Sequence, residues 1–135
     1  MRIAALAIAG GLALGGMACS DDSGSAKELC AALDSGRSFG TLFEGGLDPT
    51  DTVRALEQLR VAQVDLEQLR DVAPSEVRDD LDVELEYLGA LIEVLETVDP
   101  DDPAAVVAAV NALGDRKGSV EAAAIQLRAF QTDHC

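Results

Sequence analysis

The sequence predicts an all-α protein, folded as a small up-and-down helical bundle of three long helices and a short N-terminal helix. Apolar residues recur at spacings of three and four in each long segment, which is the period of a helix that buries one face. Prolines divide these segments from one another. No segment shows the alternating pattern that is typical of a strand. Aromatic residues make up only 3% of the chain, so we expect an aliphatic, alanine-rich core between closely packed helices.

The clearest helical pattern lies between Pro74 and Val98. One face of this predicted helix is acidic, and we call it the acidic stripe; it consists of Asp79, Asp82, Glu86 and Glu93. The opposite face is apolar and consists of Val77, Leu81, Leu85, Leu88, Ile92, Leu95 and Val98. The apolar face requires partner helices, and the acidic stripe requires water or a cationic partner.

Capping signals mark where other helices begin. Ser25 and Glu28 form a capping box that opens a short first helix. Asp48 followed by Pro49 predicts the start of the second helix, with Asp48 as the N-cap. This second helix is expected to end before Pro74 and to bury a stripe of alternating small and large residues, namely Ala55, Leu59, Ala62, Leu66, Leu69 and Ala73.

Two segments leave alternatives open. Asp102 and Pro103 predict a last helix that runs to about residue 132, either as one long helix with a weak point between Gly114 and Gly118 or as two helices joined there. A short apolar segment between glycines predicts a plug over the end of the bundle, or alternatively a lid over a ligand site; it contains Phe39, Leu42 and Phe43.

The N-terminus predicts export. Arg2 supplies a short positive region, an apolar run follows, and small residues precede Cys19, which is the pattern of a signal peptide. The apolar run is too short and too rich in glycine for a permanent membrane span. Ala18 and Cys19 match a bacterial lipobox, although Gly16 stands where leucine is usual.

These features predict a lipoprotein with three parts. We expect residues 1–18 to be a signal peptide that is removed, and residues 19–25 to be a lipid anchor, with palmitate attached at Cys19, and a flexible tether. Residues 26–135 form the helical bundle domain. The expected location is the outer face of the cell membrane, and the alternative is ordinary secretion of the same mature chain.

The chain has three cysteines, an odd number for an exported protein. Cys19 lies at the predicted cleavage point and has a separate fate as the lipidated residue. Cys30 and Cys135 then remain as a pair, so we expect one disulfide that joins the first and last helices and closes the bundle.

The charge of the chain excludes some classes of partner. The net charge is −15, and removal of residues 1–18 deletes one positive charge, that of Arg2, which leaves −16. Nucleic acid and anionic membrane surfaces repel such a chain, so contact with the membrane is expected only through the lipid.

The sequence does not support an enzyme, a metal site or a cofactor. Residues 36–40 match G-x-S-x-G, but a nucleophile elbow needs a strand before the serine, and a capped helix precedes this one. His134 is the only histidine and lies beside a cysteine that is expected to be in a disulfide, so it lacks partners for zinc binding or catalysis. The acidic residues do not follow the pattern of a calcium loop.

The lipobox-like Cys19, Cys30 in the first helix, the Ala-Pro-x-Glu-Val break at residues 73–77 and the terminal Cys135 together resemble a known group. They are similar to the small helical lipoproteins and secreted proteins of high-GC Gram-positive bacteria. That resemblance implies the location and the fold, and it carries no catalytic residues. We therefore expect a non-enzymatic, lipid-anchored envelope protein that binds an envelope protein through the acidic stripe. The alternative is a carrier or sensor for a small apolar ligand held within the bundle.

Overall fold

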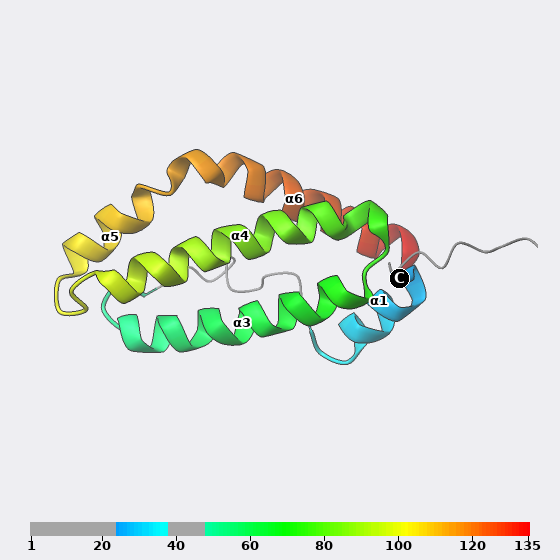
Figure 1. Ribbon diagram of the computed structural model, residues 1–135, viewed down its shortest axis with the longest axis horizontal. Helices are drawn as coiled ribbons and strands as arrows, with labels where there is room; N and C mark the ends of the chain where they lie inside the picture. Colours follow the sequence, from blue (N-terminus) through cyan, green and yellow to red (C-terminus); the bar gives the residue numbers. More distant parts are fainter. Residues whose placement is uncertain (1–23, 38–47) are drawn as a thin grey trace, which may run out of the picture.

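The computed structural model describes residues 24–37 and 48–135, and these residues form five helices. No strand occurs within these ranges, which confirms the prediction of an all-α protein. The signal peptide, Cys19 and the apolar segment with Phe39, Leu42 and Phe43 lie outside the described residues. The helices, labelled as in Figure 1, are α1 (Ala26–Asp34), α3 (Thr52–Val72), α4 (Ser75–Thr97), α5 (Pro103–Asn111) and α6 (Gly114–His134).

The long helices are arranged around α4. In chain order, α3, α4 and the α5–α6 segment run antiparallel to one another (Figure 1). Helix α4 packs against α3 and against α6 to equal extents, whereas α3 and α6 share no comparable contact within the described part of the chain. Helix α1 contacts both α3 and α6 and covers one end. The arrangement is therefore three helices with α4 as the shared partner.

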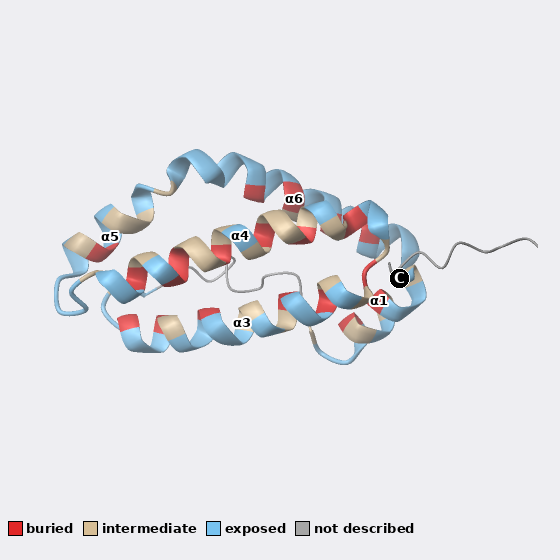
Figure 2. Ribbon diagram, in the orientation of Figure 1, coloured by how far each residue is buried: buried red, intermediate tan, exposed pale blue. Residues whose placement is uncertain are grey.

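The core is made largely of leucine. The side chains of Leu59, Leu66 and Leu69 in α3 are fully or almost fully buried, and the predicted stripe of that helix is confirmed. In α4 the buried face is wider than predicted, because α4 must cover two neighbours (Figure 2). Leu91 and Glu84 are buried, while Leu85 is only partly buried.

The second helix begins later than predicted. Asp51, rather than Asp48, is the N-cap of α3, and its carboxylate accepts a hydrogen bond from the amide of Arg54. The carboxylate of Asp48 is already engaged, because it accepts hydrogen bonds from the hydroxyl and the amide of Thr50. These two bonds hold the pKa of Asp48 below its ordinary value. The aspartate with the free carboxylate therefore takes the capping role.

The single long helix expected from Pro103 is two helices in the structure. The break lies at residues 112–113, before Gly114 rather than between Gly114 and Gly118. There the amide of Leu113 donates to the carbonyl of Val110, and the carbonyl of Leu113 accepts from Arg116, so the chain tightens into short turns. This break leaves both α5 and α6 packed on α4. The start of α5 is as predicted, since Asp102 caps its first amides.

The start of α1 is held tightly against the α3–α4 turn. The amide of Gly24 donates to the carbonyl of Ala73 at 3.0 Å. A Cβ atom at residue 24 would lie 1.8 Å from the carbonyl oxygen of Val72, so only glycine fits there. The predicted capping box between Ser25 and Glu28 is present and starts α1 at once. The described chain is thus fixed to the bundle from its first residue.

Cys30 of α1 and Cys135 at the end of α6 form a disulfide, as the sequence predicts, with Cα atoms 5.5 Å apart. The bond joins the first and last helices at the end of the bundle where Gly24 also lies. Together with the contacts of α1, it ties α3 to α6, which otherwise meet only through α4.

Reduction of the disulfide is expected to lower the melting temperature markedly. The two cysteines are separated by 105 residues, and closing a loop of about 100 residues contributes up to about 4–5 kcal/mol in the chain-entropy model. That value rivals the whole net stability of a small domain. Thermal unfolding followed by circular dichroism with and without reductant measures the effect. The Cys30→Ser/Cys135→Ser variant is the control and should melt at the lower temperature in both buffers; two free thiols in the oxidised protein would contradict the pairing.

Candidate functional site

The acidic stripe lies on the outer side of α4 and reaches solvent. Asp79, Glu86 and Glu93 are exposed, and Asp82 is half-buried. All four belong to one continuous helix, so the shared face that the sequence predicts is available to a partner in the folded protein.

Arginines from both neighbouring helices engage two of the four acids. Arg70 of α3 donates from Nε and Nη2 to the two carboxylate oxygens of Asp82, which raises the pKa of Arg70. Arg116 of α6 donates to Glu86 at 3.0 Å. Asp79 and Glu93 make no ion pair within the described residues. The acidic stripe thus consists of two paired and two unpaired carboxylates.

Sequence reasoning missed these ion pairs because the arginines lie on other helices. A third pair, Arg60 of α3 with Glu96, follows the same pattern of an α4 acid bound to a neighbouring helix. Each pair is largely exposed and is worth up to about 1 kcal/mol. Some carboxylates of α4 therefore bind arginines of the neighbouring helices and are not free to bind a partner.

Glu84 is the one acid of α4 that the fold buries, at 4% exposure. The buried positions of α4 include a regular series with spacings of four and three, in which Glu84 occupies a central place; the series is Val77, Leu81, Glu84, Leu88, Leu91 and Leu95. Glu84 was not singled out from the sequence. This heptad-like series was the signal that could have identified it.

The carboxyl of Glu84 lies on the α6 side of α4, because the cation that interacts with it is Arg128 of α6. Its Oε2 atom has no hydrogen-bond partner among the described residues. Burial raises the pKa of Glu84 to about 7; Arg128 opposes this rise, and Asp80 adds to it. The pKa of Tyr87 is also raised, by its own burial and by Glu84.

Glu84 coincides with a gap in the apolar core. Val120 and Ala123 of α6 are buried, yet they lie outside the contiguous apolar cluster that Leu127 and Phe130 join further along the same helix. A carboxyl group thus takes a place in a series of α4 whose other members are leucine or valine. An unpaired polar atom at such a place costs stability.

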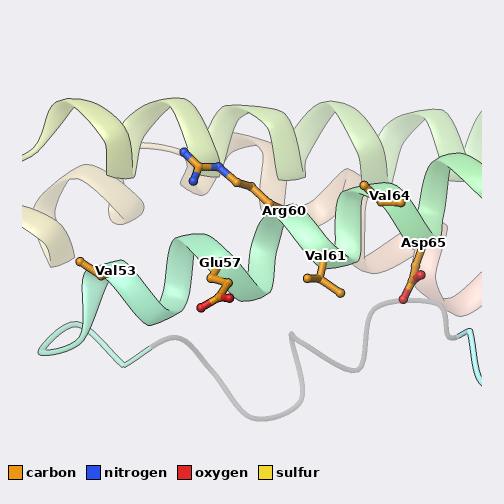
Figure 3. Close-up of a pocket in the computed structure, with 6 residues that line it drawn as sticks. All are labelled: Val53, Glu57, Arg60, Val61, Val64 and Asp65. Atoms are coloured by element: carbon orange, nitrogen blue, oxygen red, sulfur yellow. The ribbon is translucent and has the colours of Figure 1, made fainter.

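The two described hollows open at the outside of the bundle. The larger, of about 600 Å³, lies on α3, where Arg60 reaches toward α4 while Glu57, Val61 and Asp65 point away from it (Figure 3). All its described lining residues belong to that single helix, so they form only one wall. The smaller, of about 300 Å³, lies between α4 and the first half of α6 and mixes Tyr87 with the Glu86–Arg116 pair. Neither is an enclosed apolar cavity.

The residues considered for catalysis or metal binding are used otherwise or lie elsewhere. His134 stacks on Phe130, with ring centroids 4.3 Å apart. Ser38 of the G-x-S-x-G match lies outside the described residues. Among the residues that the structure describes, no group of three or more histidine, cysteine or acidic side chains is placed to hold a metal ion. None of the described helices combines the length and apolar character needed to span a bilayer.

Comparison with protein-family models, with curated proteins and with solved structures found no match. Charge, burial and connectivity within this chain are therefore the basis for its proposed function.

The free energy of unfolding is expected to fall as the pH rises from about 4.5 to about 7. The folded state binds the proton of Glu84 more tightly than the unfolded chain, because the pKa rises from an ordinary 4.5 to about 7. Protonation of Glu84 therefore contributes up to about 3 kcal/mol to the free energy of unfolding. This contribution is fully present below pH 4.5 and is lost as the pH rises through 7. Urea titrations across this range measure it.

Glu84→Gln should remove this part of the pH dependence and should be more stable than the wild type at pH 8. Glu57→Gln changes an exposed carboxylate of α3 that has no ion pair among the described residues; it is the matched control and should keep the wild-type profile. Equal pH dependence in the wild type and in Glu84→Gln would show that Glu84 does not carry the effect.

Proposed function

We propose that the protein is a lipid-anchored, non-enzymatic component of the cell envelope that binds another envelope protein through the acidic stripe. The observation that carries the location is the sequence Ala18-Cys19 after a signal-like segment. The resemblance to small helical lipoproteins of high-GC Gram-positive bacteria supports the same location.

The connection to the membrane is short in this proposal. Gly24 is fixed to the α3–α4 turn, so only the chain from Cys19 to Gly24 separates the lipid from the bundle, a span of at most roughly 18 Å. The end of the bundle with the disulfide then lies nearest the membrane. Helix α4 begins at that end and is about 35 Å long, so Glu93 lies much farther from the bilayer than Asp79.

The partner expected for the acidic stripe is a cationic protein surface. Asp79 and Glu93 are the unpaired acids, and about 21 Å of helix separates them, so one partner surface can contact both and cover the residues between. The net charge of −16 attracts such a partner from a distance and keeps the domain off an anionic bilayer. The described hollows are open and partly charged, so no described feature favours the alternative of an apolar-ligand carrier.

Cys19→Ala is expected to release the protein from the membrane or to trap the uncleaved precursor. The wild type should partition into the detergent phase, because its acyl chains anchor it. Phase partitioning and intact-mass measurement read out both effects. Ser20→Ala, at the next residue, is the control and should partition like the wild type. An unmodified Cys19 at the mature N-terminus would sink the proposal of lipid anchoring.

Asp79→Asn/Glu93→Gln, which neutralises the unpaired acids, is expected to abolish partner capture and to leave the melting temperature unchanged or slightly higher. The physical reason is that these acids repel their neighbours and bind no arginine in the described protein. Capture is measured by mild cross-linking of the membrane-anchored protein, followed by quantitative recovery at low and high salt.

Two further double variants show whether a loss of capture is specific to the unpaired acids. Asp82→Asn/Glu86→Gln removes two ion pairs and should lower stability by up to about 1 kcal/mol per pair. Glu57→Gln/Glu67→Gln makes the same change of net charge on exposed positions of α3 and should keep capture intact. Capture that survives replacement of all four acids of the stripe would leave this face without a binding role.

A further inference from the structure

The α4–α6 interface is the place where the fold departs most from a plain apolar bundle. Glu84 is buried there at a position of the leucine series, and its Oε2 atom has no hydrogen-bond partner among the described residues. The apolar cluster is interrupted at Val120 and Ala123 on the opposite helix. We propose that Glu84 is a pH-sensitive latch: its neutral form allows α6 to pack closely against α4, and its ionised form weakens this packing so that α6 opens.

Helix α6 is the element free to respond. It buries only Val120, Ala123, Leu127 and Phe130 over its 21 residues. Residues 114–119 in its first turns are exposed, and one ion pair, Arg116 with Glu86, joins them to α4 (Figure 2). Helix α3 has two ion pairs to α4, and both α3 and α6 also contact α1.

The two ends of α6 are held in different ways. The disulfide fixes Cys135 to α1, and the turn at residues 112–113 connects the other end to α5. Glu84 acts between these two points. Opening there needs only a rotation about the turn and the loss of the contacts of α6 with α4, while the disulfide keeps the helix attached.

The charged groups around Glu84 do not offset the cost of ionising its buried carboxyl. From α6 the interacting group is Arg128, and from α4 itself they are Asp80 and Tyr87. One ion pair, Arg116 with Glu86, also crosses the α4–α6 interface, and the pairs from α3 use Asp82 and Glu96; none of these pairs includes Glu84. Helix α5 has no ionisable side chain. One cation and one further acid leave burial as the dominant influence, and burial favours the neutral carboxyl.

The expected change in the fraction of open molecules with pH follows from the pKa of Glu84 in the closed and open arrangements. In the closed arrangement the pKa is about 7, and in an open, hydrated arrangement it returns to the ordinary 4.5. Between pH 6 and pH 8 the ratio of open to closed molecules then rises roughly tenfold. The open form uncovers apolar side chains of both helices, so an apolar surface becomes accessible above neutral pH.

Native-state hydrogen exchange in low concentrations of urea tests the latch, on the full mature chain in detergent with its disulfide intact. Amides around residues 120–127 of α6 should exchange roughly tenfold faster at pH 8 than at pH 6, after correction for intrinsic exchange rates. Their exchange should depend on urea less steeply than global unfolding does, because opening α6 leaves the packing of α3 against α4 intact. Amides in the middle of α3 should show the steep urea dependence of global unfolding.

Two variants complete the test. Glu84→Gln should show equal α6 protection at both pH values. Glu57→Gln, which changes an exposed carboxylate of α3, is the matched control and should behave as the wild type. Arg128→Gln, an exposed change that keeps Glu84, should enlarge the response beyond tenfold, and it decides the question where Glu84→Gln does not fold. Steep urea dependence in α6, no change with pH, or an unchanged response in Arg128→Gln would each overturn the latch.

Discussion

The packing of α4 against two helices is the constraint on which the rest of the described structure depends. Because α3 and α6 share no comparable contact, α4 must bury an arc wider than one stripe of residues. This requirement explains why Leu91 joins the buried face and why Leu85 lies only at its edge. It also leaves a single outward side of α4, on which all acids of the stripe gather.

Several acids of α4 stabilise the fold by forming ion pairs with arginines of the neighbouring helices. Asp82 and Glu96 hold arginines of α3, and Glu86 holds one of α6, so the central helix attracts both neighbours electrostatically as well as through apolar packing. A strongly acidic composition is often taken only as a sign of solubility. Here much of that charge has a defined position, and the unpaired acids are the remainder that a partner can use.

Local signals in the sequence predicted most of the helices, and long-range packing explains what they missed. The caps at Ser25 and Asp102, the stripe of α3 and the pairing of the last two cysteines depend on neighbouring residues or on elimination. The late start of α3 depended on Thr50 capturing Asp48, which a capping pattern does not distinguish. The arginine pairs required knowing that α4 has two partners, which periodicity in a single helix does not report. The burial of Glu84, by contrast, could be read from its place in the heptad-like series of α4.

The disulfide and Gly24 together define how the domain carries mechanical load. A pull on the chain before Gly24 reaches the bundle at the α3–α4 turn and, through α1, at the disulfide with the end of α6. Force therefore enters the first and last parts of the fold at the same end, and it crosses a covalent bond before it strains the leucine core. The disulfide thus keeps α1 joined to the end of α6 when the chain is pulled from before Gly24.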